Sequence, residues 1–388
     1  MAHVRLKLCV VILGICWSLL LVYVMSSLKW QPGDINAAQH MAQAGEKANI
    51  PMARAAKSQM LIKEILDAIK LSNNSKTKNI NTTSLKDLVV PTKRNETKKS
   101  DSAINVVVSG DEETLLGVMA VINSVVANTK SAVHFYVTLP KIVIPDFRKW
   151  ILKTKLHKIN YTLRPHSPEM PKGKPHFAKI YLFSIFPELE GKFVYLDSDV
   201  IVQGNIRELN NVPLDENHLG AFSEDCTSVS KRFNMAKPRY STHINLQHPK
   251  LKGNKIKPMA CTFNTNVFVA NMTKWKVENV TMQLLDWVMS SSRRQPIYGQ
   301  EPETDEAEAA MLIVLYHKTV QLPHLWHVGD LGVTAGASYS RDFIGTAKLL
   351  HWNGHFKPWA RRAAFIEVWM KYYIPDPDKK YKPIRKYL

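Results

Sequence analysis

Two acidic residues, Asp197 and Asp199, stand one residue apart at the end of an apolar run, in the stretch VYLDSDVIVQGN. Carboxylates this close repel each other, and both lose hydration beside a buried strand. Because side chains alternate along an extended segment, we expect both carboxylates on one face and Ser198 on the other. Two such groups can share a hard cation such as Mn²⁺ or Mg²⁺. A solvated strand end or a helix cap is the alternative interpretation.

The Asp-x-Asp pattern is weak evidence by itself, since a chain of this size contains about one by chance. A second copy, Asp376 and Asp378, lies in the segment PDPDKK near the C-terminus. Prolines and lysines surround this second copy, so we interpret it as a solvated turn. The apolar run before Asp197 is what distinguishes the first copy.

A second group of residues suited to chemistry lies in LLHWNGHFKPW, which contains His351, Gly354, Lys357 and Trp359. Imidazole beside two carboxylates favours Mn²⁺ over Mg²⁺. Glycine permits a close backbone approach to a ligand, and lysine offers a compact positive charge to phosphate oxygens. A histidine near a tryptophan is, taken alone, more often a packed core residue.

Strands and helices alternate before and around the first acidic pair. Continuous apolar runs predict strands at 104–109, 132–139 and 192–202, and helical periodicity predicts helices at 114–129 and 147–156. This order favours a mostly parallel sheet covered by helices on both faces. Because ligands bind beyond the carboxyl ends of such strands, we expect the Asp197 turn and the SGDEE loop on one rim.

The N-terminus predicts a membrane anchor. Residues 8–28 carry no charge and are long enough to span a hydrocarbon core of about 30 Å. A cleaved signal peptide, the alternative, has a shorter apolar region. Arg5 and Lys7 precede the run, so the positive-inside rule leaves residues 1–7 in the cytosol and places the remainder in the lumen.

Sequons and cysteines agree with a luminal location. Six Asn-x-Ser/Thr sequons follow the anchor, at Asn73, Asn81, Asn95, Asn160, Asn271 and Asn279. Of the four cysteines, two lie in the apolar run. The other two, Cys226 and Cys261, are expected to form a disulfide in an oxidising compartment, with two buried free thiols as the alternative.

Polar segments flank the predicted globular domain. Residues 29–102 read as a luminal stem with a short amphipathic helix at 61–69, residues 103–375 as the catalytic domain, and residues 376–388 as a basic, exposed tail. The formal net charge is +19, which is compatible with anionic membranes, phosphates or nucleic acid. Because the anchor directs the domain into the lumen, we expect no nucleic-acid partner.

The two motifs together resemble glycosyltransferase family 8. The match comprises Asp197-Ser198-Asp199 and, further along, His351-x-x-Gly354-x-x-Lys357-Pro358-Trp359. Residues 103–375 carry it, and the anchor with FNTNVFVANMTKWK makes the chain most similar to the animal glycosyltransferase 8 domain-containing proteins. The resemblance implies the α/β A-type glycosyltransferase fold, a Rossmann-like, mostly parallel sheet with helices on both faces. It further implies retaining, Mn²⁺-dependent transfer of a hexose or pentose from a UDP-sugar.

The resemblance also implies roles for matched residues. Three residues would bind Mn²⁺ (or Mg²⁺): Asp197, Asp199 and His351. Gly354 and Lys357 would hold the UDP diphosphate. Ser109, Gly110 and Asp111 would form the loop that cradles uridine. Asn264 and Asn266 would line the sugar pocket. Lys179 stands where many relatives carry Arg and would contact the donor. The implied partners are a UDP-sugar, a glycan or glycoconjugate acceptor, the Golgi membrane and, as one option, a second copy in a homodimer.

The expected reacting centre departs from the family pattern. Relatives often have an Asp-Gln pair before the late apolar helix, whereas this chain has ETDEAEAAMLIVLY. Glu308 or Asp305 could replace the acid, but the Gln is missing, and Glu113 stands where a relative has Asn. Glu308 is therefore the candidate catalytic nucleophile if retention proceeds through a covalent intermediate. A front-face mechanism and a catalytically inactive, lectin-like UDP-binding scaffold are the alternatives.

Overall fold

The computed structural model describes residues 102–171, 174–224, 226, 239–291, 296–298, 306–333, 339–360 and 362–384. The expected anchor at 8–28, the helix at 61–69 and the sequons at Asn73, Asn81 and Asn95 lie outside these residues. Within these ranges, no helix has both the length and the apolar character needed to cross a membrane.

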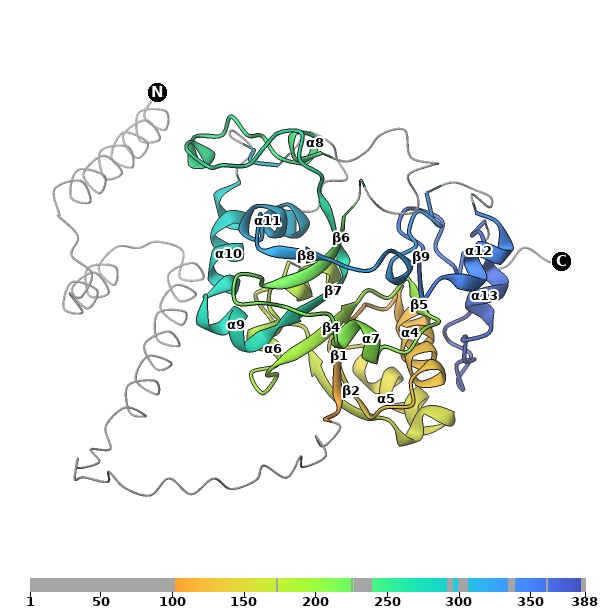
Figure 1. Ribbon diagram of the computed structural model, residues 1–388. Coiled ribbons are helices and arrows are strands. Elements are labelled where there is room, and N and C mark those ends of the chain that lie inside the picture. Colours follow the sequence, from red (N-terminus) through yellow and green to blue (C-terminus); the bar gives the residue numbers. More distant parts are fainter. Residues whose placement is uncertain are drawn as a thin grey trace, which may run out of the picture. The chain divides into compact units, whose positions relative to one another are not determined.

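A seven-stranded sheet forms the centre of the described part of the chain, in the order β3-β2-β1-β4-β7-β6-β8 (Figure 1). Strands β1 to β4 are parallel to one another, and β7 runs antiparallel to its neighbours β4 and β6. The mostly parallel sheet is thus as expected, with one reversed strand. The bounds are β1 (Ile104–Ser109), β2 (Val133–Leu139), β3 (Asn160–Pro165), β4 (Lys192–Leu196), β6 (Gly220–Glu224), β7 (Phe263–Asn271) and β8 (Thr319–Gln321).

Both faces of the sheet are covered, as alternation along the strands shows. In β1, Val106 and Val108 belong to one buried apolar cluster, and Val107 belongs to the other. β4 divides in the same way, with Leu196 in the first cluster and Tyr195 in the second. Fully buried strands with this alternation explain the continuous apolar runs in the sequence.

Different helices supply the two clusters. The first contains side chains of α4 (Leu115–Asn128), α5 (Ile144–Leu152), α12 (Arg341–Thr346) and α13 (Ile366–Met370). The second contains side chains of α6 (Leu182–Ile185), α8 (Tyr240–His243), α9 (Met272–Val277), α10 (Val280–Ser290) and α11 (Glu306–Val314). The remaining short helical elements lie between these strands and helices along the chain. They are α7 (Arg207–Asn210), η1 (Lys155–Lys158), η2 (Pro175–Lys179), η4 (Pro249–Leu251) and η5 (His324–Trp326).

A separate two-stranded ribbon joins the two motifs. β5 (Val200–Val202) directly follows the acidic pair, and β9 (Leu349–His351) ends at the histidine. The strands are antiparallel, with Val200 opposite His351. The Trp352 amide donates to the Asp199 carbonyl at 3.0 Å, which extends the pairing past His351. Residues about 150 positions apart in sequence therefore become neighbours.

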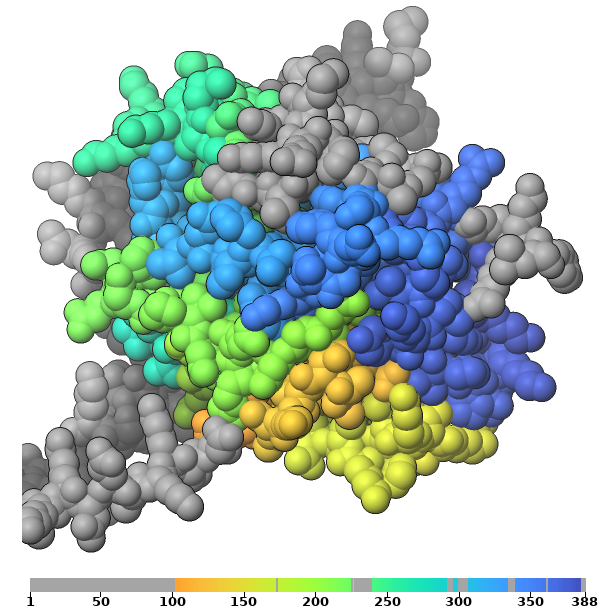
Figure 2. All heavy atoms as spheres, turned by 45° about the vertical axis from the view of Figure 1, so that its right-hand side comes forward, coloured from red at the N-terminus to blue at the C-terminus, as the bar shows by residue number. Residues whose placement is uncertain are grey.

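The C-terminal tail is exposed at Asp378, Lys379 and Lys380, as expected, but the expectation was wrong for Tyr381. Tyr381 is buried, its ring stacks on Trp150 of α5, and its hydroxyl donates to Asp146 at 2.7 Å. The Asp376 carboxylate accepts from the backbone amides of Lys380 and Tyr381. Figure 2 shows this dark blue C-terminal segment beside the orange and yellow residues of the N-terminal half. An aromatic residue in a basic tail was the signal for packing.

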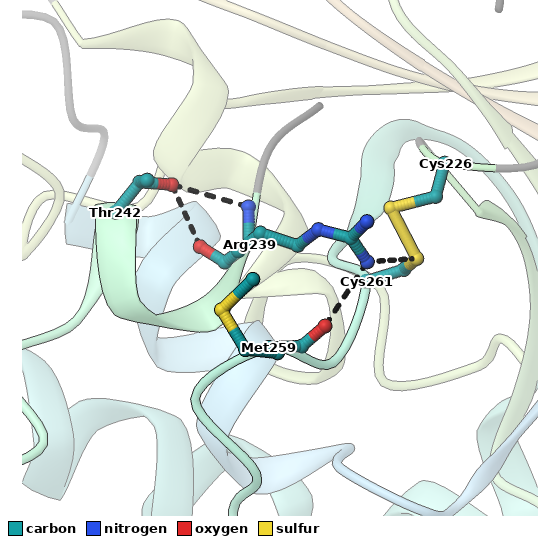
Figure 3. Close-up of a disulfide and its surroundings, with 5 residues drawn as sticks. All are labelled: Cys226, Arg239, Thr242, Met259 and Cys261. Carbon is teal, nitrogen blue, oxygen red and sulfur yellow. Dashed lines mark hydrogen bonds between the residues drawn. A yellow bond between two sulfur atoms is a disulfide. The ribbon is translucent and has the colours of Figure 1, made fainter. Parts of the chain in front are cut away.

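A disulfide joins the end of β6 to the start of β7. Cys226 and Cys261 are bonded, with their Cα atoms 5.6 Å apart (Figure 3). Arg239 lies over this bridge, and its guanidinium donates to the Met259 carbonyl at 3.0 Å. The bridge closes a loop of 35 positions beside the sheet, which restricts the unfolded chain.

Gly117 in α4 allows the acidic turn to approach the helix closely. A Cβ atom there would lie 2.2 Å from the Ser198 carbonyl oxygen and 2.6 Å from the Trp359 ring. We expect Gly117→Ala to lower the free energy of unfolding by about 2 kcal/mol through overpacking. The matched control is Gly345→Ala in α12, where nothing lies within 4 Å. Urea unfolding followed by circular dichroism compares the two, and equal effects would refute the close-approach argument.

Candidate active site

The two acidic residues follow strand β4, and a turn begins between them. β4 ends at Leu196, and Ser198 and Asp199 form the turn that leads into β5. The expectation that the segment stays extended through both acidic residues was therefore wrong, because β4 ends before Asp197. Each carboxylate instead has its own surroundings, and the turn brings Asp199 toward His351.

Asp199 lies at the centre of the site. It is 6% exposed, its Oδ2 accepts from the Lys357 ammonium at 2.6 Å, and its Oδ1 lies 3.2 Å from His351 Nε2. The Oδ1 and Nε2 atoms are both buried, and neither has a hydrogen bond among the described residues. A carboxylate oxygen and an unprotonated imidazole nitrogen that face each other in this way suit a shared cation, whereas a protonated nitrogen would pair with the carboxylate directly.

Asp197 belongs to a polar network on the neighbouring strand ends. Its Oδ1 accepts from the Tyr195 hydroxyl at 3.1 Å, and that hydroxyl lies 2.6 Å from Ser109 Oγ. Its backbone amide donates to the Asn266 carbonyl at 2.9 Å. The network therefore links the predicted uridine loop, the acidic turn and β7, as expected from the meeting of strand ends at one rim.

Lys179 is a fully buried cation in the same network. Its ammonium donates to Asn266 Oδ1 at 2.8 Å and to Thr265 Oγ1 at 3.2 Å. The amide of Asn266 in turn donates to Asn264 Oδ1 at 2.9 Å. The acceptors of this side chain are thus neutral oxygens of Thr265 and Asn266.

The two carboxyl groups differ in the direction of their pKa shifts. Burial raises the pKa of Asp197, and Lys179 only partly opposes that effect. Burial would also raise the pKa of Asp199, but His351 and Lys357 outweigh it and hold the Asp199 pKa well below its usual range. Asp199 is therefore the permanently charged member of the pair at neutral pH.

Other predicted residues have local structural roles. Asp111 Oδ1 accepts from the Thr114 amide at 3.0 Å at the start of α4, and Gly110 leaves no room for a Cβ beside Val118. Gly354 has φ +103°, and a Cβ there would lie 2.6 Å from the Gly332 carbonyl oxygen. Backbone packing thus already requires glycine at 354, separately from any approach to a diphosphate.

The candidate nucleophile lies on a separate element. Glu308 is half-buried in the first turn of α11, and Asp305 lies outside the described residues. Of the described sequons, Asn160 and Asn279 are exposed. Asn271 is half-buried, and its side chain accepts from the Lys274 amide to cap α9.

The described residues fit a divalent cation in ligand chemistry. Carboxylate oxygens of Asp197 and Asp199 and the Nε2 of His351 are ligands of the kind that Mn²⁺ accepts. Among the ranges given above, however, no three His, Cys, Asp or Glu side chains converge closely enough to form a complete metal site.

Comparison with known proteins assigns the family. The family model "Glycosyl transferase family 8" matches residues 105–363, more than half of the chain. The chain therefore belongs to glycosyl transferase family 8, and this confirms the resemblance of its motifs.

Curated relatives agree over most of the length. Glycosyltransferase 8 domain-containing protein 1 of Xenopus tropicalis is 38% identical over 75% of this chain and 82% of the relative. The Homo sapiens protein of the same name is 36% identical over 73% and 81%. Glycosyltransferase 8 domain-containing protein 2 of Mus musculus is 35% identical over 73% and 85%.

Solved structures show the fold alone. The bifunctional glycosyltransferase WbbM superposes with a TM-score of 0.53 at 20% identity, over 73% of this chain and 51% of that one. The galactosyltransferase LgtC, in complex with donor and acceptor sugar analogues, gives 0.50 at 15% identity over 69% and 95%. The mixed α/β fold is therefore that of known glycosyltransferases, in agreement with the predicted fold class.

Proposed function

We propose that this protein is a retaining glycosyltransferase that transfers a hexose or pentose from a UDP-sugar to a glycan or glycoconjugate, with Mn²⁺ or Mg²⁺ as cofactor. The observation that carries the proposal is the pairing of β5 with β9, which brings His351 to 3.2 Å from Asp199, the residue that also accepts from Lys357 at 2.6 Å. The sugar analogues bound to LgtC support a donor and an acceptor sugar as ligands of this fold.

The reaction breaks the bond between the anomeric carbon and the β-phosphate oxygen. A new bond forms to an acceptor hydroxyl oxygen, and that hydroxyl loses its proton. Negative charge grows on the departing UDP, so fixed positive groups beside the diphosphate lower the barrier. In this proposal Lys357 holds the diphosphate. A cation held by Asp197, Asp199 and His351 would supply further positive charge there.

Two mechanisms can retain the configuration at the anomeric carbon, and they differ in the role of Glu308. Lys179 would contact the donor, with Asn264 and Asn266 lining the sugar pocket. In a covalent mechanism the Glu308 carboxylate attacks the anomeric carbon before the acceptor does. In a front-face mechanism the acceptor attacks from the side that UDP leaves, and Glu308 has no covalent role.

The proposed location is the Golgi lumen, on a single-pass type II anchor formed by residues 8–28. Arg5 and Lys7 before the apolar run and the six sequons after it support this orientation. The proposed oligomeric state is a homodimer. Fluorescence microscopy of a tagged full chain tests the location, and cytosolic or nuclear signal would contradict it.

Hydrolysis of UDP-sugars by the full-length protein in detergent tests the proposed activity without knowledge of the acceptor. We expect Mn²⁺-dependent release of UDP from at least one of UDP-glucose, UDP-galactose and UDP-xylose, abolished by EDTA. The missing Gln before α11 favours a second candidate, a UDP-binding scaffold. That candidate predicts UDP binding without turnover of any donor, with or without Glu308→Gln.

A further inference from the structure

His327 is a buried histidine that makes direct contact with the predicted metal ligand His351. It follows η5 and is 5% exposed, and its Nε2 lies 2.9 Å from His351 Nδ1. The ring centroids are 5.1 Å apart at an angle of 52°. The edge-on contact through nitrogen atoms is that of a hydrogen bond rather than of stacked rings.

The backbone fixes this contact from both sides. The Val328 amide donates to the Leu349 carbonyl at 3.0 Å, and the His351 amide donates to the Val328 carbonyl at 2.9 Å. Residues 327 and 351 therefore lie on adjacent paired segments. Neighbouring side chains Trp326, Leu331 and Leu350 are buried and apolar, so this environment offers little reason for imidazole unless its nitrogen is used.

A neutral imidazole carries one proton, so only one of its two nitrogens can bind a cation. If His351 Nδ1–H donates to His327 Nε2, the His351 Nε2 lone pair is free. That nitrogen lies 3.2 Å from Asp199 Oδ1. If the proton sits on Nε2 instead, it blocks the same position. The hydrogen bond at Nδ1 therefore decides whether His351 is a ligand.

We propose that His327 is a positioning residue whose Nε2 accepts a hydrogen bond from His351 Nδ1–H. This hydrogen bond leaves His351 Nε2 unprotonated as a ligand for a divalent cation. This inference rests on the proposed metal dependence and adds to it a residue outside the sequence motifs. His327 touches neither substrate nor cation in this account. Its effect passes through His351 alone.

Binding of Mn²⁺ alone to the full-length protein, measured from the electron paramagnetic resonance of free Mn²⁺, tests the proposal without turnover. His327→Leu removes the acceptor, and we expect the Kd for Mn²⁺ to rise by about ten- to a hundredfold. His327→Gln keeps an acceptor oxygen near the Nε2 position, and we expect a Kd within about threefold of that of the unaltered protein. A common role in packing predicts similar losses in both variants.

The outcomes separate this proposal from the proposed function. If the unaltered protein and the His327→Leu variant bind Mn²⁺ equally well, only the positioning role is overturned. An unaltered protein that does not bind Mn²⁺ overturns both. If His327→Leu fails to fold, ¹⁵N-histidine NMR of the unaltered protein with Mg²⁺ decides. The Nδ1–H tautomer at His351 supports the proposal, and the Nε2–H tautomer refutes it.

Discussion

Asp199→Asn abolishes Mn²⁺-dependent use of a UDP-sugar donor. The change keeps the backbone carbonyl that accepts from the Trp352 amide but removes the charge that faces both His351 and Lys357. A bound cation contributes several kcal/mol of charge stabilisation, so we expect turnover to fall by about a thousandfold. Hydrolysis assays over a range of Mn²⁺ concentrations measure the effect, and high Mn²⁺ should not restore the rate.

The second Asp-x-Asp copy supplies the matched control. Asp378 is 40% exposed and pairs with Lys149 on the surface. A surface ion pair contributes about 0–1 kcal/mol to stability, so Asp378→Asn should leave donor use unchanged. Loss of a buried charge can also destabilise a protein, and thermal unfolding of Asp199→Asn checks for that. Equal activity of the two variants would contradict the assignment of the site.

Lys357→Met weakens UDP binding by about ten- to a hundredfold. Its ammonium is a charged donor of the site, 2.6 Å from Asp199 Oδ2 and 3.3 Å from the Trp352 carbonyl oxygen. A hydrogen bond to a charged group contributes about 1.5–3 kcal/mol, which corresponds to this loss of affinity. Methionine keeps the length of the side chain, so packing changes little.

Lys348→Met is the control for Lys357→Met. Lys348 is 39% exposed and pairs with Glu208 away from Asp199. Calorimetric titration of UDP in the presence of Mn²⁺ should give the same affinity for Lys348→Met as for the unaltered protein. If both lysine variants bind UDP normally, Lys357 does not hold the diphosphate.

Local patterns in the sequence predicted the elements of the fold well. The runs at 104–109 and 132–139 are the buried strands β1 and β2, and the helical periodicity at 114–129 is α4. These predictions succeed because burial on both faces and helical spacing leave direct marks on sequence. The reversed direction of β7 left no such mark, because a buried strand has the same composition whether parallel or antiparallel.

The site was predicted less completely than the fold. The motif residues Asp199, His351 and Lys357 do meet, but the sequence could not show that strand pairing between β5 and β9 brings them together. The turn at Ser198 was missed because the apolar runs on both sides resemble one strand. His327 was missed because the two histidines of LPHLWHVGD, His324 and His327, match no motif, and only the distance of His327 from His351 reveals its role.

The most direct test of the account is calorimetric titration of UDP into the full-length protein, once with Mn²⁺ and once with EDTA. In the proposed function, one cluster of Asp199, His351 and Lys357 serves both the cation and the diphosphate. We therefore expect UDP binding that is strong with Mn²⁺ and lost with EDTA and in Asp199→Asn. UDP binding that is equal in Mn²⁺ and EDTA, or no UDP binding at all, would contradict it.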